Sequence, residues 1–213
     1  FHSTMISIII PTYLSEKNHM DNLYKSSNYF VKYIHNKRLL KIINLIPKKK
    51  KLKILDAGCG EGHLLKMINH NQKNHSLYGV DITPIAVKSA KLRLPLATIS
   101  NECLDSLSFS SNYFDIVICT EVIEHIPDYH KALNELQRVL KKDGLLIISF
   151  PNEPICILLR LLFFRKPFIK DHYNWFSPRK ISKCIRSQYH KKVNLPFNLP
   201  WFISLINILV FKK

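Results

Sequence analysis

The stretch Ile54-Leu55-Asp56-Ala57-Gly58-Cys59-Gly60-Glu61-Gly62 decides the fold of this chain. It opens as a short apolar run typical of a buried β-strand, and glycines then recur at alternate positions. A glycine backbone turns tightly and lets a ligand lie where a Cβ would collide. The spacing G-x-G-x-G differs from the G-x-G-x-x-G of dinucleotide-binding sites, and it contains no phosphate-binding lysine. We therefore expect a strand–loop–helix unit whose loop binds a ligand without a pyrophosphate.

Two aspartates accompany this loop. Asp56 stands two residues before the first glycine, where a carboxylate is a poor neighbour for a pyrophosphate and a good one for an ammonium group. Asp81 ends the next apolar run, 19 residues past Gly62, where an acid can accept both hydroxyls of a ribose. The pair points to recognition of an ammonium group and a ribose.

The strand–helix unit repeats along the chain. Apolar patterns predict strands at residues 53–56, 75–81, 96–100, 114–119 and 145–150, and helices at 37–46, 61–69, 84–92 and 129–140. This alternation predicts an α/β fold with a doubly wound, mostly parallel sheet and helices on both faces. Because crossovers between parallel strands are right-handed, the carboxyl ends of the strands share one rim, where ligands bind.

The glycine loop, its preceding acid, the acid after the second strand and the alternation together resemble the S-adenosylmethionine (SAM) binding motifs of class I methyltransferases. This Rossmann-like class includes the type 11/12 methyltransferase domains and the ubiquinone-biosynthesis O-methyltransferases. The resemblance implies about seven strands, the last one antiparallel. It also implies that Asp81 binds the ribose, that Ile82 packs on the adenine, and that the loop holds the methionine part through Asp56, Gly58, Cys59, Gly60 and Gly62.

Further cofactor contacts follow from the same resemblance. Class I methyltransferases often place an aspartate near the start of the loop after the third strand, where it binds the adenine amine. Here that position is Cys103, so the candidates for the adenine contact are Glu102, Cys103 and Leu104. Thr120, at the end of the fourth strand, would border the pocket, and Arg38 could lie near the methionine carboxylate.

The stretch Thr120-Glu121-Val122-Ile123-Glu124-His125 follows the fourth strand. If a helical turn starts here, Glu121, Glu124 and His125 share one face that looks toward the methyl group. His125 could then remove a proton from an acceptor hydroxyl. Alternatively, the three side chains could bind a divalent metal that orients and acidifies the hydroxyl. Acids in a first turn also complement the helix dipole, which would be a purely structural role.

The pattern Glu-x-x-Glu-His resembles two metal-using groups of O-methyltransferases, those of ubiquinone biosynthesis and those acting on the 3′-terminal ribose of small RNA. The stretch Asp171-His172-Tyr173-Asn174-Trp175 is similar to the one in which the RNA group supplies another histidine ligand. His172 could therefore complete a metal site with Glu121, Glu124 and His125. A metal-free catalytic role for these residues is favoured over the metal site.

The chain is strongly basic, with 32 Lys+Arg against 15 Asp+Glu and a formal net charge of +17. Such an excess of positive charge favours anionic partners such as phosphorylated substrates, nucleic acid or an anionic membrane surface, although a lysine-rich composition can also serve solubility alone.

Apolar runs fall short of the ~18–20 residues that a membrane span needs. Residues 155–168 mix leucine and phenylalanine with Arg160, Arg165 and Lys166, which suits an amphipathic element at a membrane surface, a lipid tunnel or a lid helix.

The boundaries predict a single domain over residues 5–213. Residues 5–46 would form an N-terminal helical cap, residues 52–150 the SAM-binding core, and residues 151–213 a substrate-side lid with a helix at 177–187 and strands at 191–195 and 206–211. The stretch 201–211 could instead be a membrane-seeking tail. Residues 1–4, ahead of Met5, read as a remnant of cloning.

The function expected from the sequence is SAM-dependent O-methylation of a small-molecule, lipid or glycan acceptor. Five widely spaced cysteines without a CxxC pair favour free thiols and hence the cytoplasm, with peripheral contact at the membrane surface. One alternative is methylation of a ribose hydroxyl in RNA, and another is a non-catalytic SAM-binding protein.

Overall fold

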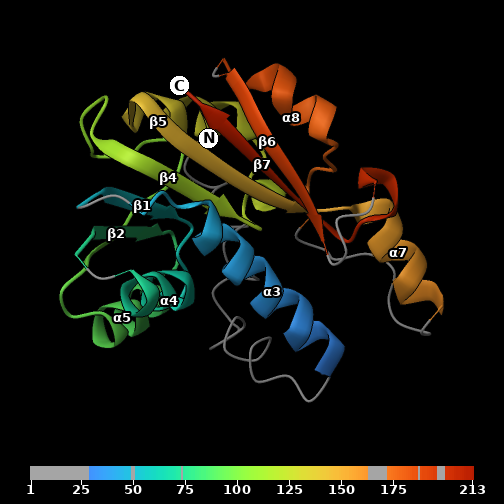
Figure 1. Ribbon diagram of the computed structural model, residues 1–213, viewed down its shortest axis with the longest axis horizontal. Coiled ribbons are helices and arrows are strands. Elements are labelled where there is room, and N and C mark those ends of the chain that lie inside the picture. The colour runs from blue at the N-terminus through green and yellow to red at the C-terminus, as the bar shows by residue number, and fades with distance from the viewer. Residues whose placement is uncertain (1–28, 49–50, 73, 163–171, 187, 196–199) are drawn as a thin grey trace, which may run out of the picture.

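The computed structural model describes residues 29–48, 51–72, 74–162, 172–186, 188–195 and 200–213 (Figure 1). Residues 1–4, most of the expected cap, residues 163–168 of the amphipathic stretch and Asp171 lie outside the described residues. The described part contains one seven-stranded sheet flanked by helices.

The sheet has the strand order β3-β2-β1-β4-β5-β7-β6. Strands β1 to β5 run parallel to one another, and β7 lies antiparallel between β5 and β6. This arrangement confirms the doubly wound, mostly parallel sheet with an antiparallel last strand. Its bounds are β1 (Lys53–Ala57), β2 (Ser76–Asp81), β3 (Thr98–Asn101), β4 (Phe114–Thr120), β5 (Leu140–Pro151), β6 (Gln188–Leu195) and β7 (Ile206–Lys212).

Helices cover both faces of the sheet, as predicted. One hydrophobic core joins the sheet to α3, α4 and α5, and a second joins its other face to α6 and α8. Helix α7 follows β5 and extends beyond the sheet (Figure 1). The helices are α3 (Tyr29–Leu45), α4 (His63–Asn71), α5 (Pro84–Arg93), α6 (Tyr129–Val139), α7 (Glu153–Leu162) and α8 (Pro178–Cys184), with short 3-10 helices η1 (Ile123–His125) and η2 (Trp201–Ile203).

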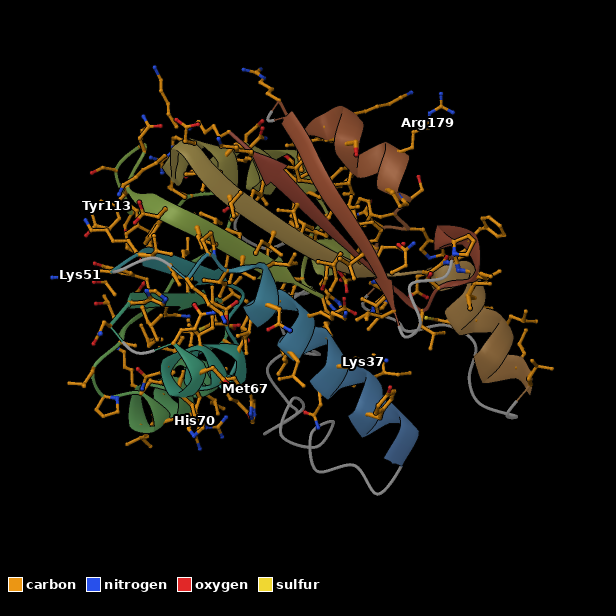
Figure 2. The ribbon with its side chains drawn as sticks, in the orientation of Figure 1. Lys37, Lys51, Met67, His70, Tyr113 and Arg179 are labelled. Carbon is orange, nitrogen blue, oxygen red and sulfur yellow. The ribbon has the colours of Figure 1, made fainter. Side chains whose placement is uncertain are left out.

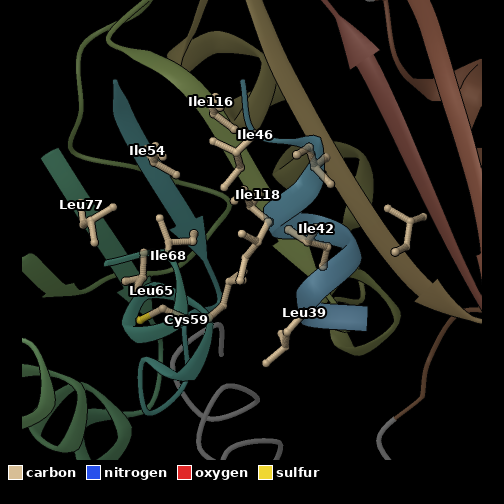
Figure 3. Close-up of a cluster of buried hydrophobic side chains, with 14 of the residues drawn as sticks. Leu39, Ile42, Ile46, Ile54, Cys59, Leu65, Ile68, Leu77, Ile116 and Ile118 are labelled. Atoms are coloured by element: carbon tan, nitrogen blue, oxygen red, sulfur yellow. The ribbon is translucent and has the colours of Figure 1, made fainter. Parts of the chain in front are cut away.

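The central strands are buried on both faces, which explains why their sequences are almost continuously apolar. In β4, Ile116 and Ile118 belong to the first core, whereas Val117 and Cys119 belong to the second. Figure 3 shows the side chains of α3 reaching the first core beside β1 and β4. Each fully buried aliphatic side chain contributes roughly 1.5–3 kcal/mol of transfer free energy. The cap helix α3 is thus part of the folded domain.

Several boundaries differ from the sequence expectations for local reasons. Helix α3 begins at Tyr29, eight residues earlier than expected, and α8 ends at Cys184 because Ile185 is extended and buried as the chain turns toward β6. Thr83 is the N-cap residue of α5, but its side chain makes no capping bond. Residues 206–212 form the buried strand β7, so the strand interpretation is confirmed over the membrane-tail alternative.

Candidate active site

The glycine loop joins β1 to α4 and is pressed against its neighbours. Gly58, Gly60 and Gly62 all have left-handed φ angles, of 80°, 51° and 77°. A Cβ on Gly58 would lie 2.4 Å from Cγ2 of Val122, so a side chain does not fit there. The amides of Gly58 and Cys59 donate to the carbonyl oxygen of Val80. The loop therefore stays at the carboxyl end of β2, as the motif predicts.

Asp81 lies at the end of β2 beside this loop. Its Oδ2 accepts a hydrogen bond from the Gly60 amide at 2.8 Å, and its Oδ1 accepts one from the Thr83 amide at 2.8 Å. A carboxylate offers about four acceptor positions, so both oxygens can still accept from ligand hydroxyls. The neighbouring Ile82 is 57% exposed, and its side chain is open to packing against a planar group.

Asp56 is only 2% exposed, at the carboxyl end of β1. Its Oδ1 is buried and has no hydrogen-bond partner among the described residues. The pKa of Asp56 is raised to about 7, chiefly by burial and also by the charge of Asp81, while the charge of Arg38 acts in the opposite direction. A buried acceptor without a partner is costly unless a ligand supplies the donor. The site therefore fits the ammonium group of a SAM molecule.

Arg38 brings a buried positive charge from α3 to the same rim. It is 1% exposed, and its Nη1 lies 3.5 Å from Oε2 of Glu121. Oε1 of Glu121 accepts a hydrogen bond from the Ser149 hydroxyl at 2.8 Å, and the Glu121 amide donates to the Ser149 carbonyl oxygen. Within the described structure, Arg38 is thus tied to Glu121, and it is close enough to Asp56 to affect its pKa.

The expected helical turn after β4 does not form as a regular α-helix. Glu121 has a left-handed φ of 55°, and only residues 123–125 form the 3-10 helix η1. The turn at Glu121 brings the side chain of Val122 against Gly58. Thr120 is half-buried at the end of β4. The i, i+3, i+4 spacing therefore does not place Glu121 on one face with Glu124 and His125.

Glu124, His125 and His172 meet beyond the end of β4. Their candidate ligand atoms all lie within 4.8 Å of one another. The imidazole rings of His125 and His172 pack edge to face with centroids 4.7 Å apart, and Nδ1 of His172 lies 2.6 Å from Oε1 of Glu153. The amide of Tyr173 donates to the Glu124 carbonyl oxygen at 2.9 Å. Two distant segments of the chain thus form one cluster.

Glu124 is buried in this cluster. Burial raises the pKa of its carboxyl group well above the ordinary value, and the nearby charge of Glu121 acts in the same direction. Its Oε2 has no hydrogen-bond partner in the described part of the chain. One carboxylate and two imidazoles form a donor set that suits a divalent cation. Of the four predicted metal ligands, Glu121 is the one outside this group.

The residues predicted to contact the adenine have different environments. Both oxygens of Glu102 accept hydrogen bonds, from the Ser100 hydroxyl and from the amide and hydroxyl of Ser108. Burial acts to raise the pKa of Glu102, but these bonds outweigh it and lower the pKa. Cys103 is exposed, whereas Leu104 is buried. Glu102 therefore fixes the shape of the loop after β3.

Sequence reasoning missed two residues that support the site. Glu153, in the first turn of α7, pairs with His172, and Ser149 of β5 holds Glu121. Both lie near the carboxyl end of β5, at the rim where ligands bind in such sheets. That topological rule could have identified Glu153, since it follows Pro151 by two residues.

Comparisons with known proteins agree with this geometry. A family model described as a methyltransferase domain matches residues 30–188. A probable SAM-dependent methyltransferase of Mycobacterium tuberculosis is 32% identical over 51% of this chain and 39% of its own length. A ubiquinone biosynthesis O-methyltransferase of Haemophilus ducreyi is 29% identical over 48% of this chain and 47% of its own length. The chain spans about half the length, or less, of these curated relatives.

A solved structure resembles the fold over nearly the whole chain. Magnesium protoporphyrin IX methyltransferase from Synechocystis, with bound S-adenosylhomocysteine (SAH), superimposes with a TM-score of 0.75 at 18% identity, covering 97% of this chain and 99% of that one. At this identity the likeness concerns the fold alone. The family match, the strand order and the glycine loop lead to one conclusion: the chain belongs to the class I, SAM-dependent methyltransferases.

Proposed function

We propose that this protein transfers the methyl group of SAM to a hydroxyl oxygen of a small-molecule, lipid or glycan acceptor. The observation that carries the proposal is the cluster of Glu124, His125 and His172 beyond the carboxyl end of β4. The cluster lies at the rim of the sheet that also carries the glycine loop, and His172 comes from the segment 151–213. A cluster of this kind can bind a hydroxyl group and accept its proton.

The SAM sulfonium supplies a methyl group that is already activated for transfer, so the protein contributes mainly binding and orientation. Asp56 would accept from the ammonium group, and Asp81 would accept from the ribose hydroxyls. Gly58 lets the side chain of Val122 pack against the backbone of the loop and so holds the loop against the turn after β4. The exposed Ile82 would cover one face of the adenine.

His125 is the residue that we assign to the acceptor. Its imidazole can accept the proton that the hydroxyl loses as the new carbon–oxygen bond forms. His172 packs against it, and Glu153 holds His172 in turn. Glu121 would support this arrangement through Arg38 and Ser149 without touching the acceptor.

An acidic surrounding favours a hydroxyl over a carboxylate as the acceptor group. Asp56, Glu121, Glu124 and Glu153 all approach this rim, and the buried cation Arg38 pairs with Glu121. A second carboxylate brought into such a site would be repelled. A neutral hydroxyl meets no such penalty.

All five cysteines are free thiols, which agrees with the proposed cytoplasmic location.

The test measures cofactor binding and methyl transfer separately. Calorimetry with SAH should detect binding to the wild type and to His125→Asn, whereas transfer of labelled methyl groups to lipid, glycan or RNA extracts should fall by about 10²–10⁴-fold in that variant. His130→Asn alters an exposed histidine on α6 and serves as the control. Full transfer by His125→Asn, or labelling confined to RNA, would contradict the proposal.

A further inference from the structure

The excess positive charge of this chain is confined to its flanks. Residues 52–150 carry 10 Lys+Arg and 11 Asp+Glu, so the SAM-binding core is almost neutral. Residues 1–51 carry 10 Lys+Arg against 2 Asp+Glu, and residues 151–213 carry 12 against 2. A lysine-rich composition that served solubility alone would not spare the core. The charge therefore points to an anionic partner beside the flanking segments.

Helix α7 carries an exposed apolar face within this basic flank. Leu158, Leu161 and Leu162 are 52%, 53% and 63% exposed, and their i, i+3, i+4 spacing places them on one side of the helix. Figure 1 shows that α7 extends away from the sheet. Leaving three leucines exposed on a projecting helix costs solvation free energy, which burial against an apolar partner would recover.

A second apolar element lies beside the start of α7. Phe202 and Ile203 of η2 are also exposed, and the following turn is joined to α7 through two contacts with Leu205. The carbonyl oxygen of Leu205 accepts a hydrogen bond from the Asn152 amide at 2.9 Å and lies 3.8 Å from Sγ of Cys156. The leucines of α7 and these two residues form what we call the α7–η2 surface.

The segment of sequence that contains the α7–η2 surface is rich in basic residues. Arg179 and Lys183 of α8 are exposed, and Figure 2 shows Arg179 pointing outward at the top of the view. The sequence adds Arg160 within α7 and Arg165, Lys166 and Lys170 just after it. Leucines beside cations are the composition with which amphipathic helices bind anionic lipid surfaces. RNA would use the cations but not the leucines.

We propose that the α7–η2 surface docks onto an anionic lipid bilayer. Within the described residues, no helix is both long and apolar enough to cross a bilayer, so docking would be peripheral. Glu153 in the first turn of α7 contacts His172, which belongs to the cluster of Glu124, His125 and His172 that we call the acceptor cluster. The docked helix would therefore lie beside the acceptor cluster. Delivery of a membrane-embedded acceptor to His125 would rest on the proposed function, whereas docking itself needs no turnover.

The experiment measures sedimentation of the full chain with vesicles. Vesicles of phosphatidylcholine containing about a third phosphatidylglycerol should bind the protein, and pure phosphatidylcholine should bind it more weakly. Replacing Leu158, Leu161 and Leu162 together with serine should lower the partition coefficient by roughly tenfold or more. The control replaces Leu92 and Leu96 with serine, two leucines in and just after α5 that are even more exposed (79% and 98%), and it should leave binding unchanged.

A second pair of variants separates the contribution of charge. Arg179→Gln with Lys183→Gln should weaken binding to the anionic vesicles several-fold, and added salt should reduce the difference. Lys88→Gln with Lys91→Gln removes the same charge from α5 and should have no comparable effect. SAH binding by every variant verifies the fold and tests the proposed cofactor site independently of docking.

Several results would overturn the docking proposal. One is wild-type protein that fails to sediment with anionic vesicles at low salt. Another is an equal loss of binding in the α5 control. A lower melting temperature in the triple-serine variant with unchanged vesicle binding would mean that another part of this chain covers the leucines. A dimer that dissociates in that variant would assign the surface to a second copy. If RNA displaced the protein from vesicles equally well in the wild type and in the triple-serine variant, the positive charge would be assigned to nucleic-acid binding instead.

Discussion

Glu153 of α7 and His172 form a largely buried pair, with 2.6 Å between Oε1 and Nδ1, and this pair connects α7 to the cluster of Glu124, His125 and His172. Glu153 occupies one nitrogen of the His172 ring, and the ring in turn packs against His125. The orientation of the proposed base therefore depends on a carboxylate that touches neither SAM nor the acceptor in our assignment. Such support acts on the rate by holding the geometry of the reacting groups.

Replacing Glu153 tests this support. Glu153→Ala leaves Nδ1 of His172 without its partner, and we expect methyl transfer to fall by up to about a hundredfold while SAH affinity stays unchanged. Glu153→Gln keeps a hydrogen-bonding group and should retain more activity than alanine. Steady-state kinetics with calorimetry would measure both. Equal activity in the two variants and the wild type would show that the pair is only structural.

Asp56 should make stability and SAH binding depend on pH. Its folded pKa of about 7 lies above the usual value near 4, so the folded state keeps a proton that the unfolded state loses. The stability associated with that proton is present below about pH 4 and is lost as pH rises toward 7. Urea titrations of the cofactor-free protein should show this loss in the wild type, and Asp56→Asn should reduce it and leave the part that comes from the raised pKa of Glu124.

Cofactor binding should follow the opposite trend. The ionised carboxylate of Asp56 is the form that attracts an ammonium group, so SAH affinity should increase between about pH 6 and 8 in the wild type. Asp56→Asn should bind SAH weakly and without this pH dependence. A pH-independent affinity in the wild type would argue against contact between Asp56 and the amino group.

Gly58 should tolerate no side chain. Gly58→Ala places a Cβ 2.4 Å from Val122 and forces alanine into a left-handed conformation that costs about 1–2 kcal/mol. We expect a lower free energy of unfolding and reduced SAH affinity. Adding Val122→Ala should remove the steric part and leave the conformational cost, so the double variant should recover partly. Full recovery would mean that the φ angle of 80° is not required.

Arg38 and Glu121 should be strongly coupled. Arg38→Met removes the buried cation and leaves the Glu121 carboxylate without its partner, which costs about 3–5 kcal/mol for a buried pair and less here because Glu121 is partly exposed. Glu121→Gln in the same chain should restore part of the lost stability. A double-mutant cycle on the free energy of unfolding measures the coupling, and additive effects would show that the two side chains act independently.

Exhaustive chelation distinguishes proton abstraction by His125 from catalysis by a divalent metal bound to Glu124, His125 and His172. With His125 acting as the base, methyl transfer should persist after treatment with a chelator, and added Mg²⁺ or Zn²⁺ should not increase it. Loss of activity that a divalent cation restores, and that Glu124→Gln abolishes, would instead assign Glu124, His125 and His172 to a metal. SAH calorimetry on the chelated sample controls for loss of the fold.

The sequence by itself determined the sheet and the cofactor loop of this protein. Alternating apolar strands and helices, with glycines at 58, 60 and 62, specify local conformations that do not depend on distant residues. The position of Asp56 and Asp81 at one rim could be predicted because the carboxyl ends of parallel strands lie at a common edge of the sheet. The periodic spacing of Glu121, Glu124 and His125 was misleading, because the left-handed turn at Glu121 breaks the helical register.

Only the tertiary structure decided which side chains share the acceptor site. Glu124 and His172 are 48 residues apart, and the backbone bonds from Tyr173 and Asn174 to the Glu124 carbonyl oxygen bring them together. Arg38 met Glu121 because α3 packs across β1 and β4 through contacts of high sequence separation. A sequence pattern records spacing along the chain, whereas these pairings depend on how α3 and the segment that starts at His172 pack at the rim of the sheet.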